Sequence, residues 1–514
     1  MKRTPLSLIA HWAGGELHGE DVAIDAITQD SRGLAAGSLY VALRGERFDG
    51  HDFADDAAAR GASALLVERV LPGVELPQVQ VADSQLALAR IAHGMQRDRA
   101  TRVFAITGSN GKTSVKSLLL AILEHAGRIA GSTVHANPGN RNNEIGLPLA
   151  VIDAPEDADY AIYEMGAGKP GDIAYLTDVV RPDFALVNNI APAHLERMGN
   201  LLGVARTKGA IYAALPEHGV AAINADDAFG LWFEQHFLRV PRKSTAHPCA
   251  GVLSSAAPHR QVLRYALDAS AELHARNLVL GEDGARFTLV APQGEAEVTL
   301  ALPGRHNVRN ALAAAALTLG AGIPLAQVAQ GLAEARPVAG RQVRHVLGNG
   351  AVLIDDSYNA NPGSLAAAID ALAAGPSEGW LVLGDMRELG SEAEALHAEA
   401  GRRARAAKLV RLYALGPLSA AAAAAFGEGG RVFGSHEALA LALWRDVGEV
   451  AGIREKQDRE QESKQMYENT GADAVGERAP FRAPTILIKG SRGSAMDKIV
   501  TALLAHQEEV PNVA

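Results

Sequence analysis

A glycine-rich turn followed by lysine and threonine is the strongest chemical signal in this chain of 514 residues. Residues 103–114 read VFAITGSNGKTS, an apolar run typical of a strand and then the turn, and a helical pattern begins at Val115. A helix that begins there directs its free backbone N–H groups into the turn, which favours a bound phosphate. We therefore predict a nucleoside triphosphate site. Its expected residues are Gly108, Ser109, Asn110, Gly111, Lys112, Thr113 and Ser114.

Two side chains of this turn have expected roles in phosphate chemistry. Lys112 is expected to reach the outer phosphates as a point charge, and the Thr113 hydroxyl is expected to bind Mg²⁺. The spacing departs from the general phosphate-loop pattern, because Ile106 stands where the first glycine is usual. A plain glycine turn between a strand and a helix is the alternative.

Three further side chains are candidate metal ligands. Glu164 ends the apolar run 160–163, so its carboxylate is expected to reach Mg²⁺ beside Thr113. His194 follows the run that ends at residue 189 and is expected to bind a second ion, although such a histidine is more often structural. Lys208 lies in the helical stretch 202–215; if it is buried, it loses its charge and becomes a nucleophile able to add carbon dioxide. An ordinary exposed helix lysine is the alternative.

Polar residues in the second half of the chain are further candidates for contacts with the nucleotide. Asn310 lies one turn into a helix expected to be capped by His306 or Asn307, and it is predicted to face the nucleotide. Arg341 follows the linker 337–340 and is predicted to close over phosphate. The segments 355–362 (DDSYNANP), 383–390 (LGDMRELG) and 489–493 follow three predicted strands and could form one polar wall. A turn built by local Asn and Asp hydrogen bonds is the alternative for the first of these.

Apolar runs that alternate with helical stretches predict how these residues are positioned. Strands are expected at 160–164, 184–188 and 220–224, and again at 351–355, 380–384, 411–415 and 485–489, with an irregular β-rich stretch near 261–303. Such alternation predicts mostly parallel sheets in an α/β protein. We expect three domains, at 1–100, 101–337 and 338–514. The charged stretch 449–478 is expected to be a solvated or partly disordered insertion rather than a partner-binding tail.

Composition limits the functional class. The net charge of −10 gives no sign of a nucleic-acid partner, and no stretch reaches the roughly 20 apolar residues of a membrane span. Cys249 is the only cysteine, so an intrachain disulfide and a four-cysteine zinc site are excluded. We therefore expect a soluble cytoplasmic protein without membrane insertion.

Nearly the whole chain resembles the Mur ligase family, the ATP-dependent amide ligases of peptidoglycan precursor synthesis. The phosphate-loop motif TGSNGKTS carries part of this resemblance. Two departures are Ala210, where an acidic residue is expected, and the length of the 449–478 insertion. The other motifs are DSRGLAAGSLYVALRGERFDGHDF (30–53), GNRNNEIGLPL (139–149), YEMGAG, AHLERMG, GRHNVRNALAA, DDSYNANP, LGDMRELG and ILIKGSRGSAM.

The resemblance implies a small α/β N-terminal UDP-binding domain, a central P-loop domain with a mostly parallel sheet and a C-terminal Rossmann-like domain. It also implies ATP and two magnesium ions, held by Thr113, Glu164, His194 and a carbamylated Lys208. Catalytic roles are implied for Lys112, His194, Lys208 and Arg341. ATP contacts are implied for Asn310, Arg341, Asp356, Asn359 and Asn361. Substrate contacts are implied for Ser31, Arg32, Gly45, Arg47, Asp49, His51, Asn142 and Asn143.

The activity implied is addition of D-alanyl-D-alanine to UDP-N-acetylmuramoyl-tripeptide through an acyl phosphate, by a monomer that closes over ATP. The third-step, diamino-acid-adding ligase of the family is one alternative, but its DNPR signature is absent. A folylpolyglutamate synthetase-like ligase is another, and the 30–53 region, which is similar to a UDP module, argues against it. A nucleotide-gated binding protein without ligase activity is the third alternative. The identity of the third peptide residue, meso-diaminopimelate or lysine, stays open.

Overall fold

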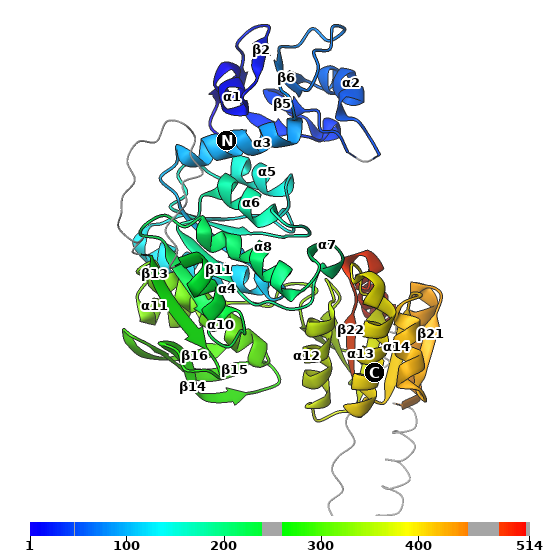
Figure 1. The fold of residues 1–514 in the computed structure, drawn as a ribbon. Helices are drawn as coiled ribbons and strands as arrows, with labels where there is room; N and C mark the ends of the chain where they lie inside the picture. Colours follow the sequence, from blue (N-terminus) through cyan, green and yellow to red (C-terminus); the bar gives the residue numbers. More distant parts are fainter. Residues whose placement is uncertain (46, 239–259, 451–482, 510–514) are drawn as a thin grey trace, which may run out of the picture. The chain divides into compact units, whose positions relative to one another are not determined.

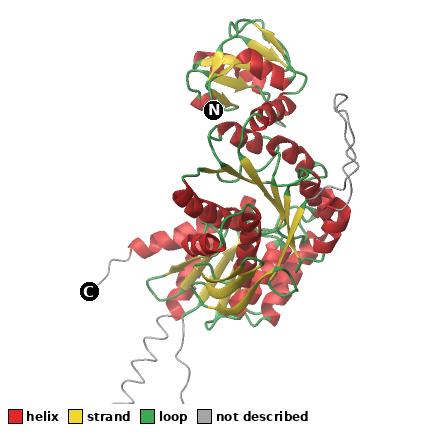
Figure 2. Cartoon of the chain, turned by 90° about the vertical axis from the view of Figure 1, so that its left-hand side faces the viewer, coloured by secondary structure: helices red, strands yellow, loops and turns green. Residues whose placement is uncertain are grey.

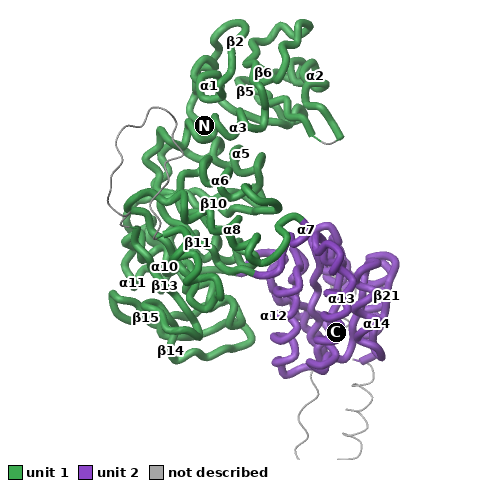
Figure 3. Tube along the Cα trace, in the orientation of Figure 1, with its two compact units in different colours: residues 1–190, 197–336 green, residues 191–196, 337–514 purple. Residues whose placement is uncertain are grey.

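The computed structural model describes residues 1–45, 47–238, 260–450 and 483–509. The chain forms two compact units, one of Met1–Ile190 with Arg197–Arg336 and the other of Ala191–Glu196 with Pro337–Ala514 (Figure 3). The short segment Ala191–Glu196 thus belongs to the second unit, although the chain on both sides of it belongs to the first. Within the described part of the chain, no helix is both long and apolar enough to cross a membrane.

The first unit begins with a five-stranded sheet of order β2-β7-β6-β5-β4 (blue in Figure 1). All four residues of β5 and most of β6 are buried, and Tyr40, Leu65 and Val67 belong to one core cluster. The elements are β1 (Thr4–Pro5), α1 (Leu6–Ala13), β2 (Glu16–His18), β3 (Ala23–Ile24), β4 (Ala26–Thr28), β5 (Ser38–Val41), α2 (Ala54–Ala59), β6 (Ala62–Val67), β7 (Gln78–Gln80) and α3 (Ser84–Arg97).

A nine-stranded sheet of order β16-β15-β14-β13-β12-β11-β8-β10-β9 fills the rest of this unit. The strands from β9 to β14 pair in parallel, and β14, β15 and β16 pair antiparallel. The strands are β8 (Arg102–Thr107), β9 (Val134–Ala136), β10 (Tyr160–Glu164), β11 (Phe184–Val187), β12 (Val220–Asn224), β13 (Gln261–Ala266), β14 (Leu273–Leu280), β15 (Ala285–Ala291) and β16 (Gly294–Leu300). The β-rich stretch expected near 261–303 extends the sheet, and its expected irregularity appears as a register shift between Arg276 and Val279 in the pairing of β14 with β15.

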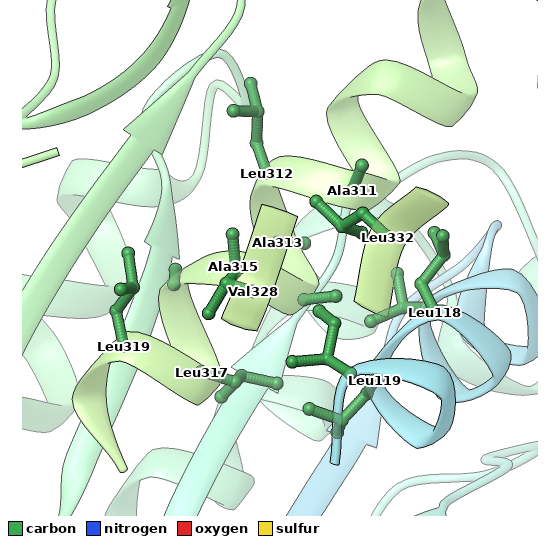
Figure 4. Packing of buried hydrophobic residues seen from close by; sticks show 14 of the residues in the cluster. Leu118, Leu119, Ala311, Leu312, Ala313, Ala315, Leu317, Leu319, Val328 and Leu332 are labelled. Atoms are coloured by element: carbon green, nitrogen blue, oxygen red, sulfur yellow. The ribbon is translucent and has the colours of Figure 1, made fainter. Parts of the chain in front are cut away.

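Helices cover both faces of this sheet (Figure 2). On one face, the alanines of α10 let that helix pack closely with α4 and α11 in a single apolar core (Figure 4). Gly331 lets α11 lie directly against the backbone of α4, because a Cβ at this position would lie only 2.5 Å from the Ile122 Cα. The helices are α4 (Lys112–Ala130), α5 (Gly146–Asp153), α6 (Asp172–Val180), α7 (Leu195–Met198), α8 (Leu201–Ala213), α9 (Gly230–Phe233), α10 (Arg305–Gly320) and α11 (Leu325–Glu334).

The second unit is built on a six-stranded sheet of order β17-β18-β22-β19-β20-β21, parallel except for β17. Successive residues of β19 alternate between two cores: Leu381 and Leu383 face one cluster, and Trp380 and Val382 face the other. The strands are β17 (Val343–Val346), β18 (Val352–Asp356), β19 (Gly379–Gly384), β20 (Arg411–Leu415), β21 (Gly430–Phe433) and β22 (Thr485–Lys489). The helices are α12 (Pro362–Ala373), α13 (Ala393–Ala406), α14 (Ser419–Phe426) and α16 (Asp497–Glu509), and residues 436–450 are also helical.

The strands expected from apolar runs all occur, within about one residue at each end. The alanine run 420–425 lies in α14. Nearly all of the expected insertion 449–478, and Cys249, lie outside the described residues.

Candidate active site

The predicted phosphate turn lies between β8 and α4 and has the backbone of an anion cradle. Gly111 is the N-cap of α4 with φ 78°, and Gly108 has φ 150°, so both positions require glycine. The first helical N–H groups point toward the turn, as expected for a phosphate site. Lys112 Nζ donates to the Gly108 carbonyl at 2.8 Å, which folds the side chain back across the turn.

Asn188 and Asn189, which follow β11, both hold this turn through hydrogen bonds. Asn189 Oδ1 accepts from Asn110 N at 2.8 Å, and its carbonyl accepts from Ser109 N at 2.9 Å. Asn188, only 2% exposed, donates to the Asn110 carbonyl at 3.0 Å. Because β11 is the parallel neighbour of β8, residues just after its end meet the turn.

Asn310, predicted to face the nucleotide, lies buried beneath Gly111. Its Oδ1 accepts from Asn188 Nδ2 at 3.0 Å, and a Cβ on Gly111 would lie 2.6 Å from that oxygen. Asn310 therefore supports the turn from below. The same network explains why a larger residue does not fit at position 111.

Glu164 and Thr113 lie together, as predicted. Thr113 Oγ1 donates to Glu164 Oε2 at 2.8 Å, and Asn142 Nδ2 donates to Glu164 Oε1 at 3.0 Å. The carboxylate is on a residue only 3% exposed, at the end of β10 and next to the phosphate turn. Hydroxyl and carboxylate oxygens are the donors that Mg²⁺ prefers, so this pair fits a magnesium ion beside a bound triphosphate.

Lys208 of α8 is buried, with 2% of its surface exposed. Burial, together with the smaller effect of the nearby Lys112 charge, lowers the pKa of its amine to about 7. Near neutral pH a large fraction of this amine is therefore neutral and nucleophilic. The alternative of an ordinary exposed lysine is wrong.

The pKa of Lys208 predicts how stability changes with pH. Between about pH 7 and its unfolded value of 10.5, the unfolded chain binds a proton at Lys208 that the folded chain does not. The contribution of Lys208 to the free energy of unfolding should therefore rise with pH across that window. Lys208→Met should flatten this rise when the two proteins' unfolding midpoints are compared at several pH values. Identical pH profiles would show that the lysine is charged in the folded protein.

His194 belongs to the other compact unit, and its imidazole Nδ1 pairs with Glu388. Both residues have positive φ values, 53° and 62°, which non-glycine residues adopt rarely. His194, predicted to bind a second ion, contacts the loop after β19 through Glu388. Among the described residues, no three His, Cys, Asp or Glu side chains gather in a metal-binding arrangement.

The predicted loops of the second unit form one internal network. Lys489 Nζ pairs with Asp356 Oδ2 at 2.6 Å and donates to the Asn359 carbonyl at 3.1 Å. These contacts arise because Asp356 and Lys489 are register partners at the ends of β18 and β22. Arg341 lies over the Tyr358 ring, with 4.2 Å from its guanidinium carbon to the ring centroid.

Asn359 and Asn361, two of the expected ATP contacts, form local hydrogen bonds. Asn361 is the N-cap of α12 and forms a capping box with Ser364. Asn359 Oδ1 accepts from Ala360 N at 2.9 Å. The turn chemistry considered as the alternative is therefore present at both positions.

Removal of the Lys489 charge should strongly destabilise the second unit. Lys489→Met leaves the Asp356 carboxylate buried without its cation, at a cost of about 3–5 kcal/mol. Hydrogen exchange of the amides in β18 and β22 measures this loss locally. The double variant Asp356→Leu/Lys489→Met removes both charges and should recover part of the protection. Equal exchange in wild type and Lys489→Met would contradict the assigned role of the pair.

The N-terminal loop predicted to contact substrate has both exposed and buried members. Gly45 and Arg47 are exposed, whereas the His51 side chain is fully buried. His51 Nδ1 bonds Asp49 at 2.5 Å, and its Nε2 accepts from Glu68 N at 2.8 Å. His51 and Asp49 therefore fix the loop in place, and His51 offers no exposed atom to a ligand.

Of the remaining residues predicted to contact substrate, some lie on the surface and others form hydrogen bonds within the protein. Arg32 forms two bonds with Asp30 on the exposed surface, next to Ser31. Asn143 Oδ1 accepts from the N–H of Gly146, the first residue of α5, at 2.8 Å, whereas Asn142 Nδ2 donates to Glu164.

Three family profiles match this chain in order. The Mur ligase family catalytic domain matches residues 23–95, the Mur ligase middle domain residues 106–318 and the Mur ligase glutamate ligase domain residues 340–478. The chain belongs to the Mur ligase family and has its three-domain α/β fold with mostly parallel sheets.

Particular members of the family are similar over nearly the full chain. The UDP-N-acetylmuramoyl-tripeptide–D-alanyl-D-alanine ligase of Escherichia coli (strain K12) is 41% identical over 97% of this chain and 98% of its own. The ligase of the same name from Bacillus subtilis (strain 168) is 32% identical over 94% of each chain. A crystal structure of MurF from Acinetobacter baumannii has a TM-score of 0.82 at 28% identity, covering 98% of this chain and 100% of that one.

Proposed function

We propose that this protein is the ATP-dependent ligase that joins D-alanyl-D-alanine to UDP-N-acetylmuramoyl-tripeptide in peptidoglycan synthesis. The observation that carries the proposal is the 41% identity with the Escherichia coli ligase over 97% of the chain. The site geometry supports it, because a phosphate turn, a hydroxyl and a buried carboxylate lie together in the first unit.

The reaction proposed has two bond-forming steps. A carboxylate oxygen of the tripeptide attacks the γ-phosphorus of ATP, and ADP leaves; the dipeptide amine then attacks the acyl carbon, and phosphate leaves while the amine loses a proton. Lys112 and the N–H groups at the start of α4 neutralise charge on the phosphates. Arg341 is proposed to add positive charge when the protein closes over ATP. Magnesium, when bound, would neutralise phosphate charge beside Thr113 and Glu164.

Further roles are proposed for the predicted residues. Carbamylated Lys208 and His194 would complete the magnesium ligands; His194 would bind through Nε2, because its Nδ1 pairs with Glu388. Asn310, Asp356, Asn359 and Asn361 would shape the nucleotide site indirectly, through the turns that they fix. The exposed loop residues near Gly45 would contact the UDP-linked substrate. Domain boundaries at 100 and 337, a monomeric state and a cytoplasmic location stay predictions.

Two related activities are tested against this one. A diaminopimelate ligase structure has a TM-score of 0.51 at 18% identity, and the folylpolyglutamate synthase of Mycobacterium tuberculosis has a TM-score of 0.57 at 17% identity. At these identities, the two enzymes share only the fold with this chain. A ligase that adds a single diamino acid or acts on a folate would release phosphate with those substrates instead.

Phosphate release with ATP, Mg²⁺ and D-alanyl-D-alanine, with and without UDP-N-acetylmuramoyl-tripeptide, tests the function. Release should require both substrates, and mass spectrometry should identify the pentapeptide product. Running the assay with tripeptides that contain meso-diaminopimelate or lysine identifies the third residue. Release that ignores both substrates would favour a nucleotide-gated binding protein and overturn the proposal.

A further inference from the structure

Lys116 is a buried lysine close to the proposed reaction centre, and the proposed chemistry does not use it. It lies on α4 three residues after Thr113, so the two side chains leave the same face of the helix. Its residue is only 7% exposed. A lysine is rarely buried unless its ammonium group is paired, so the partners of Lys116 indicate what it does.

These partners lie on one loop and one carboxylate. Lys116 Nζ donates to the carbonyls of Asn137 at 2.9 Å and Gly139 at 3.2 Å, and it lies 3.6 Å from Glu164 Oε2. The first residues of the loop 137–143 are therefore hydrogen-bonded to a lysine of α4, the helix that follows the phosphate turn. Thr113 contacts the same Glu164 oxygen at 2.8 Å.

The far end of this loop is fixed to the other oxygen of the same carboxylate. Asn142 Nδ2 donates to Glu164 Oε1 at 3.0 Å, and the Asn142 carbonyl accepts from Gly166 N at 2.8 Å. Asn137, 1% exposed, also accepts from Glu164 N at 2.9 Å. Lys116 is thus the side chain that links the start of this loop to the nucleotide helix.

We propose that Lys116 is a positioning residue for the carboxylate substrate: it sets loop 137–143, which carries Asn142 and Asn143, relative to Glu164. This inference rests on the proposed function and on the substrate contacts that the resemblance implies for Asn142 and Asn143. A bound substrate must be held in register with the phosphate, and a displacement of about 1 Å is enough to lower the rate about 100-fold. Lys116 would hold the loop, and through it the substrate, in position relative to the phosphate without contacting either substrate.

The test compares KM values for the two substrates in Lys116→Met. KM for UDP-N-acetylmuramoyl-tripeptide should rise at least about tenfold, while KM for ATP changes less than about threefold, because the turn itself keeps its own bonds. Lys116→Arg, which keeps the charge and can donate to both carbonyls, should recover most of the affinity. Equal rises in both KM values, or no rise in either, would overturn the inference and leave Lys116 a purely structural lysine.

Arg128→Met is the matched control, because it removes an exposed cation from the other end of α4. Both its KM values should equal those of wild type. If Lys116→Met does not fold, Lys116→Gln keeps one donor and should show the same split to a smaller degree; its absence would equally overturn the inference.

Hydrogen exchange of ligand-free protein separates this inference from the proposed function. Loop 137–143 should exchange faster in Lys116→Met than in wild type, while the amides of β8 stay protected. Wild type that is inactive on the UDP-linked substrate would refute the function and leave this result intact. Unchanged exchange in loop 137–143 would refute the role of Lys116 alone.

Discussion

Replacement of Gly111 by alanine is expected to lower kcat/KM for ATP by about 100-fold or more. Gly111 has φ 78°, and a Cβ there would lie 2.5 Å from Asn188 Nδ2 and 2.6 Å from Asn310 Oδ1. Both neighbours are nearly fully buried, so they cannot move away without disturbing the brace of the turn. The turn itself must shift, and its N–H groups then miss the phosphate oxygens. Steady-state kinetics at varied ATP measures this loss.

The chain offers a matched control at the other end of the same helix. Gly131, the C-cap of α4, has φ 76°, but a Cβ there meets nothing within 4 Å. Gly131→Ala therefore introduces the same backbone strain, about 1–2 kcal/mol, without a clash. Its kcat/KM should equal that of wild type at a slightly lower unfolding midpoint. If Gly111→Ala behaves like Gly131→Ala, the turn does not hold the phosphates.

Loss of the Lys208 amine is expected to lower kcat by about 1,000-fold or more, the scale seen when a catalytic group is removed. Lys208→Ala removes the nitrogen that would carry the carbamate and leaves a cavity in its place. A short carboxylate such as formate should enter that cavity and supply two carboxylate oxygens in place of the carbamate. Added formate should therefore restore part of the activity, and the assay is phosphate release at increasing formate.

Lys208→Met distinguishes this rescue from a general salt effect. The methionine fills the space of the lysine and buries no amine, so the variant should fold at least as stably as wild type. Its activity should be as low as that of Lys208→Ala, but formate should not restore it. Full activity in either variant without formate would exclude a carbamate at this position.

Much of the fold could be predicted from the sequence, because buried parallel strands appear as unbroken apolar runs. The runs 160–164 and 485–489 coincide with β10 and β22, and the glycine turn lies between β8 and α4. The contact between Thr113 and Glu164 could also be expected, since Glu164 ends β10 and Thr113 lies at the start of the helix that follows the parallel neighbour β8.

Other parts of the site depend on packing that no local pattern reveals. Asn189 and Asn188 brace the phosphate turn because β11 is the neighbour of β8, which is a property of strand order. His51 is buried because the loop folds over it, although its motif suggested a ligand contact. Lys116 was missed because it looks like an ordinary helix lysine until its partners are known.

The placement of Ala191–Glu196 has a consequence for how this protein can be dissected. The unit that contains Pro337–Ala514 is not encoded by one continuous stretch of the gene, since six residues of it come from the middle of the other unit. A fragment that begins at residue 337 would lack His194, the partner of Glu388. The complementary fragment would carry residues 191–196 without the unit against which they pack. In chimeras between related ligases, residues 191–196 and the loop 387–390 should therefore be taken from the same parent.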